Sequence, residues 1–208
     1  MEKGGGGFSM DRINQLVRKE TVNTVKPRFN TRLALLAVTV AAAMWIVAGA
    51  LQLTNPDEVR DTTTDTVIGH FAVALFSGAL ALTIPLALAL GDYARSRRPA
   101  YLMSAGLGLL ALASTISNIV GHDPVFFLVA APIANLMWLG GAIWLAVSLS
   151  KAGLVPRWVA IALPFVQVFA LPLSFIGGMI VAGGYYIAAA QVLKAEAAAE
   201  PAPEALPA

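Results

Sequence analysis

Long hydrophobic runs separated by short polar stretches dominate the pattern along the chain. Four of these runs extend over 21 to 25 positions without a charged residue, and they cover residues 33–53, 67–90, 100–120 and 125–149. A helix needs roughly 20 apolar residues to cross a hydrocarbon core about 30 Å thick. Each of the four runs therefore predicts one membrane-spanning helix.

The last hydrophobic run is too long for one crossing. Residues 158–193 contain no charged side chain over 36 positions, and a helix of that length would measure about 54 Å. Pro172 and the pair Gly177–Gly178 favour a break, because proline and glycine interrupt helices. The pattern predicts two spans here, 155–171 and 173–193, joined by a tight turn.

The segments on either side of this hydrophobic part have a different composition. Residues 1–32 form a basic cytoplasmic lead, in which residues 8–26 place their apolar side chains on one helical face and basic residues elsewhere. This pattern favours either a short helix on the inner leaflet or an ordinary solvated or partner-docked segment. Residues 194–208 are rich in Ala, Pro and Glu, which is typical of a disordered tail. Residues 33–193 between them predict an all-α, polytopic membrane helix bundle of about six transmembrane helices.

The basic residues are distributed unevenly across the predicted membrane. If the N-terminus lies in the cytoplasm, thirteen of the fourteen Lys and Arg residues lie on the cytoplasmic side. Only Arg60 lies on the other side, in a loop that also carries acidic residues. Because basic loops remain in the cytoplasm, this asymmetry predicts that both termini are cytoplasmic.

Composition agrees with a membrane protein and excludes several kinds of chemistry. Hydrophobic residues make up 58% of the chain and charged residues 12%, whereas a soluble domain carries roughly 25% charged residues. The chain has no cysteine, which excludes disulfides and thiolate metal sites. A net charge of +2 gives no reason to expect nucleic acid as a partner.

The hydrophobic runs 33–53, 67–90, 100–120, 125–149 and 158–193 contain no Asp, Glu, Lys or Arg. Proton relays, voltage sensors and many ion-coupled transporters need such residues inside the membrane, so these functions are disfavoured. The phosphate-binding, dinucleotide-binding, hydrolase and zinc-protease motifs are also missing from the sequence. The sequence therefore favours a protein that is not an enzyme, and it predicts no cofactor.

Polar side chains gather toward the predicted outer half of the bundle. In the third span and just after it, Ser114, Asn118 and His122 follow one another at intervals of four residues and so share one helix face. The second and fourth spans add others, and together these side chains are predicted to surround an outward-opening polar pocket. The candidate ligand-binding residues are His70, Ser77, Ser114, Asn118, His122 and Asn135.

The stretch GHDP between the third and fourth spans has two interpretations. It is first a tight outer turn, in which Gly121 ends one helix and Pro124 begins the next. Alternatively, His70, His122 and Asp123 bind haem or a divalent metal at the outer surface, since imidazole and carboxylate suit such ions. The two histidines are 52 positions apart, and this spacing matches no ligand motif.

Three hypotheses on function follow from these residues. The first is an accessory or scaffolding subunit that associates with membrane lipids and with other membrane protein subunits or with itself. Small residues that let helices approach closely support it, at Gly106/Gly108, Gly140/Gly141 and Gly183/Gly184. The alternative is a small-molecule or lipid binding or transport protein that uses the polar pocket. The third is the outer-surface metal or haem site.

The segment SLSKAGLVPRWVAIALPFVQ, residues 148–167, carries a resemblance to known sequences. Its motif Gly153–Trp158 is similar to the inner loop and following helix of uncharacterised multi-spanning membrane proteins from actinobacteria-like genomes. The likeness covers about the second half of the chain. It implies a helix bundle in a bacterial plasma membrane, and it supplies neither an activity nor functional residues.

Overall fold

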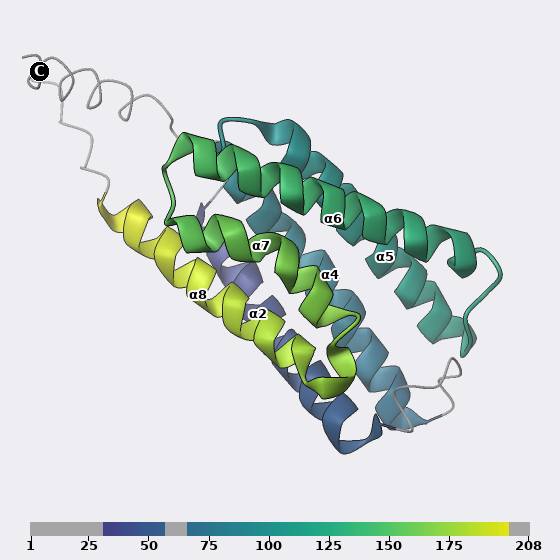
Figure 1. Cartoon of the computed structure of the whole chain (residues 1–208). Coiled ribbons are helices and arrows are strands. Elements are labelled where there is room, and N and C mark those ends of the chain that lie inside the picture. Colours follow the sequence, from purple (N-terminus) through teal and green to yellow (C-terminus); the bar gives the residue numbers. More distant parts are fainter. Residues whose placement is uncertain (1–30, 57–65, 200–208) are drawn as a thin grey trace, which may run out of the picture.

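Six α-helices build the part of the chain that the structure describes (Figure 1). The computed structural model describes residues 31–56 and 66–199. The helices are α2 (Thr31–Thr54), α4 (Val67–Tyr93), α5 (Arg97–Val120), α6 (Phe127–Ala152), α7 (Arg157–Ala170) and α8 (Gly178–Ala199), with a short 3-10 turn, η1 (Ser174–Ile176), before α8. The described residues contain no strand. The predicted all-α helix bundle is confirmed.

Four of these helices, α2, α4, α5 and α6, are long and apolar enough to cross a membrane. The bundle is therefore consistent with a multi-pass membrane protein. The helix α7 has 14 residues, which is about 21 Å and falls short of a hydrocarbon core of about 30 Å. Crossings by α7 and α8, and with them the total of six, stay a prediction.

The helices form a closed ring in which each one packs against the next along the chain (Figure 1). The ring closes because α8 returns to pack along α2, so that the first and last described helices lie side by side. Short turns connect α4 to α5, α5 to α6 and α6 to α7, and they force neighbouring helices to run antiparallel. The inside of the ring is filled by a single hydrophobic core to which every helix contributes.

Glycines set the spacing of two pairs of helices in this ring. A Cβ atom at Gly106 or Gly141 would collide with the backbone of the partner helix, so α5 and α6 meet at contact distance. Gly183 does the same between α8 and α2, where a Cβ would lie 2.8 Å from the Ala42 carbonyl oxygen. Around Gly140 and Gly184 no such neighbour lies within 4 Å. Thus only Gly141 of the pair Gly140/Gly141 and only Gly183 of the pair Gly183/Gly184 pack inside the bundle.

The chain reverses between α7 and α8 in a turn that needs both predicted glycines. Gly177 adopts a left-handed backbone, with φ of 90°, which glycine tolerates and other residues rarely do. At Gly178 a Cβ would collide with the carbonyl oxygen of Phe169. The turn occupies residues 171–177, so it is longer than the single-residue break at Pro172 that we expected.

The helix α8 continues further than the sequence suggested. We expected the disordered tail to begin at residue 194, whereas α8 ends at Ala199. The extra residues read KAEAAA, and alanine, lysine and glutamate all favour helix. Residues 200–208 lie outside the described residues. So do residues 1–30 of the basic lead and the loop 57–65 that contains Arg60.

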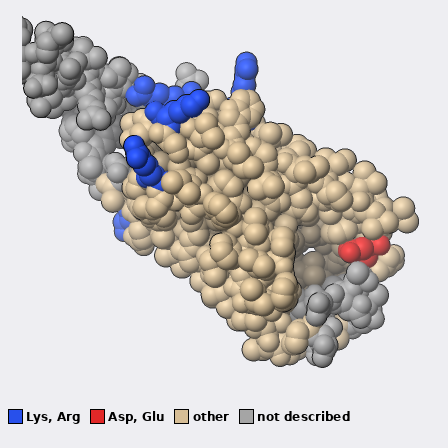
Figure 2. Space-filling view, in the orientation of Figure 1, with Lys and Arg blue, Asp and Glu red and all other residues tan. Residues whose placement is uncertain are grey.

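The two ends of the bundle differ in charge. The end at which α4, α6 and α8 finish, here called the basic end, carries the Lys and Arg side chains shown in blue in Figure 2. At this end Asp92 forms a bidentate ion pair with Arg97, with an Nε–Oδ1 distance of 2.7 Å and an Nη2–Oδ2 distance of 3.1 Å. The opposite, distal end carries Asp123 in the turn between α5 and α6.

Candidate functional site

The distal end brings two of the predicted site residues into direct contact. Thr66 caps α4, because its side chain accepts a hydrogen bond of 3.0 Å from the Gly69 amide. This cap places His70 in the first turn of α4, opposite the last turn of α5. The His70 Nδ1 lies 2.8 Å from the Asn118 Oδ1. Since an amide oxygen only accepts, His70 donates from Nδ1 and the pair ties α4 to α5.

A second polar contact holds the turn between α5 and α6. The Ser117 hydroxyl lies 3.2 Å from the His122 carbonyl oxygen and contacts the Asp123 carboxylate. Gly121 ends α5 in a left-handed conformation, with φ of 81°. The side chains of His122 and Asp123 are exposed. The turn interpretation of this stretch accounts for these contacts without a ligand.

The remaining predicted residues do not join a common pocket with His70 and Asn118. Ser77 is buried and donates to the carbonyl oxygen of Val73 in its own helix, at 2.8 Å. Ser114 is buried one turn before Asn118. Asn135 pairs instead with α7, where Gln167 Nε2 donates to its backbone and side-chain oxygens at 2.9 and 3.0 Å. The predicted polar residues are therefore dispersed: His70–Asn118 and Asn135–Gln167 join pairs of helices, whereas Ser77 bonds within its own helix.

The predicted metal site gains no geometric support. Within residues 31–56 and 66–199, the structure holds no group of three His, Asp or Glu side chains that could bind a metal ion. One ring nitrogen of His70 is also engaged by Asn118.

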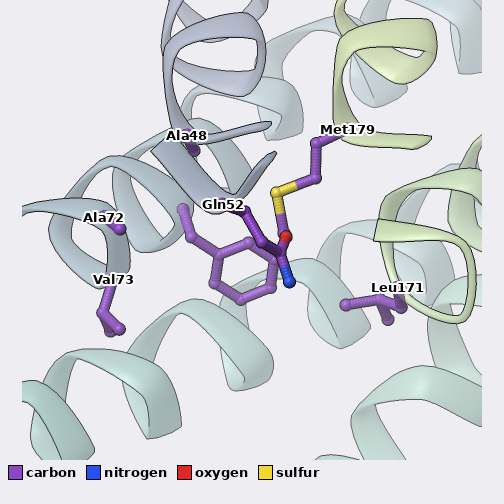
Figure 3. Close-up of a pocket in the computed structure, with 7 residues that line it drawn as sticks. Ala48, Gln52, Ala72, Val73, Leu171 and Met179 are labelled. Atoms are coloured by element: carbon purple, nitrogen blue, oxygen red, sulfur yellow. The ribbon is translucent and has the colours of Figure 1, made fainter. Parts of the chain in front are cut away.

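A pocket that the sequence did not suggest lies at the distal end, inside the ring (Figure 3). Its volume is about 160 Å³, and its walls come from α2, α4, the end of α7 and the start of α8. The residues that line it are Ala48, Gln52, Ala72, Val73, Phe76, Leu171 and Met179. Six of the seven are apolar and none is charged, so the pocket suits an uncharged and mainly apolar molecule.

Among the described residues of this wall, Gln52 is the one with a polar side chain. Its side chain reaches into the space between Met179 and Leu171 (Figure 3). Its Nε2 donates to the Ser174 hydroxyl at 3.3 Å, which joins α2 to the turn before α8. Its Oε1 is buried and accepts no hydrogen bond from any described residue. An unsatisfied buried acceptor is uncommon in folded proteins, so the pocket offers one hydrogen-bonding position to an occupant.

An aromatic cluster closes the pocket on the side of the bundle centre. The Phe76 ring meets the Trp45 ring edge-on, with their centroids 5.5 Å apart. Trp45 in turn packs on Trp138 at 6.4 Å and on Tyr186 at 6.5 Å. These last three side chains are fully buried. Phe76 thus joins the wall of the pocket to the buried aromatic cluster.

The sequence contained a weak signal for this site. Gln52 is the only amide side chain in the first predicted span. Its partner Ser174 lies 122 residues away, and the turn that carries Ser174 returns to α2 only because α8 closes the ring. No spacing rule connects two such positions.

Comparisons of the chain with protein-family models, with curated proteins and with solved structures give no match. The resemblance to membrane proteins of actinobacteria-like genomes stays a prediction.

Proposed function

We propose that this protein is an integral membrane protein that binds a small, mainly apolar molecule in the distal pocket. The observation that carries this proposal is the cavity lined by apolar side chains with the unsatisfied Oε1 of Gln52 inside it. The pocket differs from the polar one that we expected, because α2, α4, the end of α7 and the start of α8 form it, while Ser114 and Asn135 are not among its lining residues.

The size of the cavity limits the part of a molecule that it can hold. An apolar cavity of about 150 Å³ in a protein core binds benzene. A cavity of about 160 Å³ therefore accepts a six-membered ring, or the end of a longer chain.

The proposed site lies on the outer side of a bacterial plasma membrane. This placement rests on the thirteen-to-one distribution of basic residues in the sequence. The Lys and Arg side chains that the structure describes lie at the basic end, away from the pocket (Figure 2). Figure 2 also shows a hollow in the surface at the distal end.

The proposal is tested by following the methyl group of Met179, which lines the pocket, by NMR of the protein in phosphatidylcholine nanodiscs. Cyclohexanol, a six-membered ring with a polar group, is expected to shift this signal in a saturable manner. The variant Ala72→Leu fills the pocket and is expected to abolish the shift. Ala74→Leu, on the exposed side of the same helix, serves as the matched control. An equal response from Ala72→Leu and the wild type would reject the pocket as the binding site.

The accessory-subunit hypothesis keeps one specific observation in its favour. In α6 only 28% of an apolar 18-residue stretch is buried inside the bundle, compared with 44% of the corresponding stretch in each of the other three long helices. Gly140 lies in the middle of α6 with open space around it, and a second membrane helix can approach closely at such a residue. We propose docking of another membrane subunit there as the second candidate function.

Co-purification after mild solubilisation tests this second candidate. Gly140→Leu is expected to release the bound subunit, whereas Gly184→Leu, at an equally open glycine of α8, is expected to retain it. Gly141→Leu is not a suitable test, because Gly141 packs against the backbone of Met103 inside the same bundle. Retention of the subunit by Gly140→Leu would reject this docking surface.

A further inference from the structure

We infer that Gln52 makes the distal pocket selective for molecules that carry a hydroxyl group. This inference rests on the proposed binding function and adds the chemical class of the ligand. It follows from two features of the same side chain, the engaged amide nitrogen and the free amide oxygen. The ligand class comprises neutral alcohols and phenols whose apolar part fills the cavity.

The free oxygen defines which hydrogen-bonding group an occupant needs. Gln52 Nε2 already donates to Ser174 Oγ, while Oε1 is buried and has no donor among the residues of the described ranges. An occupant without a donor, such as an alkane, an ether or a ketone, leaves Oε1 unsatisfied. A buried acceptor without a donor is unfavourable, so an occupant that donates is preferred.

The other lining residues exclude charged donors. An ammonium group would also satisfy Oε1, but the described residues of the wall provide no carboxylate to accompany it, since their other side chains are apolar. Burial of an unpaired charge in such surroundings is strongly unfavourable. A hydroxyl group meets both requirements, because it donates one hydrogen bond and carries no charge.

The carbon skeleton of the occupant packs against Val73 and Leu171, which lie on either side of the Gln52 amide (Figure 3). Such an alcohol can come from the water outside the membrane or from the hydroxyl-bearing end of a lipid. The chemistry at Gln52 is the same for both sources, so the experiment has to separate them.

The experiment compares cyclohexanol with methylcyclohexane, in which a methyl group replaces the hydroxyl. Binding to the protein in phosphatidylcholine nanodiscs is measured by the Met179 methyl signal, for the wild type and for Gln52→Met, which keeps the length of the side chain. One net hydrogen bond corresponds to an expected weakening of cyclohexanol binding by about 2- to 10-fold in Gln52→Met. The affinity for methylcyclohexane is expected to stay the same or to rise.

Two further variants control for indirect effects. Gln167→Met makes the same replacement on α7, at a residue that bonds Asn135 and does not line the pocket, and should leave both affinities unchanged. Ser174→Ala removes the partner of Nε2 but keeps Oε1, so the preference for cyclohexanol should persist. The inference would be overturned if Ser174→Ala lost the preference for cyclohexanol while Gln52→Met retained it.

The outcomes separate this inference from the proposed function. If neither compound shifts the Met179 signal of the wild type, the proposed binding function fails. If both compounds bind and Gln52→Met weakens them equally, only the hydroxyl selectivity fails. Dioleoylglycerol added to the nanodiscs distinguishes the sources: displacement of cyclohexanol assigns the site to a lipid hydroxyl, and its absence assigns it to a free alcohol. Either source supports the inference.

Discussion

Two levels of the same ring differ in how completely side chains fill their interior. At the middle level, α2, α6 and α8 contribute Trp45, Trp138 and Tyr186, and these side chains fill the space between the helices. At the distal level, α2 and α4 contribute Ala48 and Ala72, and a cavity of about 160 Å³ remains. The helices α2 and α4 are continuous through both levels, so on these two helices the size of the inward side chains decides where the ring is filled.

This difference indicates a division of roles along the bundle axis. Helices inside a membrane associate mainly through close packing and hydrogen bonds, because lipid is as apolar as their side chains. The filled middle level supplies this packing, and the glycine contacts of Gly106 and Gly141 hold α5 against α6. The distal level contributes less packing and contains the cavity in which the proposed ligand would bind.

Breaking the filled level is expected to have the largest effect. Trp138→Ala removes a fully buried indole and leaves a cavity beside Trp45 in the core, so the free energy of unfolding should fall by about 3 kcal/mol. Trp144→Ala, six positions later in α6 with 47% of the side chain exposed, should change it by only about 0.5 kcal/mol. Denaturant titrations in micelles, followed by circular dichroism, measure both values. Equal losses would contradict a special role for the middle level.

Filling the distal level is expected to have a smaller effect of the opposite sign. Ala72→Leu places three additional carbon atoms in the pocket, and better packing should raise the free energy of unfolding by about 1 kcal/mol. The same titration measures this change, with Ala74→Leu as the exposed control on α4. A stabilised variant that no longer binds cyclohexanol would show that the distal level is open for binding at the expense of stability. Destabilisation would instead mean that the cavity cannot accept a leucine.

The sequence predicted the helices well and their interior poorly, for a physical reason. Hydrophobic length alone located α2, α4, α5 and α6, because a membrane core has a fixed thickness. The reversal near Gly177 was also visible, since a left-handed residue followed by a close contact requires glycine. Both signals are local in the chain.

The pocket depends instead on contacts between residues far apart in the sequence. Ala48, Ala72 and Met179 are unremarkable in their own helices, and only the closure of α8 on α2 brings them to one cavity. The polar stripe on α5 includes Asn118, whose side chain contacts His70 of α4; binding of a ligand by these two residues stays a prediction. The stripe could not reveal that Asn135 turns toward Gln167 on α7, because helix periodicity does not identify which neighbouring helix a face meets.

The smallest effect is expected at the rim of the distal level. Asn118→Leu removes the hydrogen bond to His70, which lies at an exposed position, so the free energy of unfolding should fall by about 0.5 kcal/mol. Neither residue lines the pocket, and the cyclohexanol affinity measured at Met179 should remain that of the wild type. Because Gln52→Met is expected to weaken cyclohexanol binding without touching this rim, the two variants separate ligand recognition from the joining of α4 to α5. A loss of cyclohexanol binding in Asn118→Leu would mean that the binding site includes the His70–Asn118 contact, and the separation of ligand recognition from this contact would then be wrong.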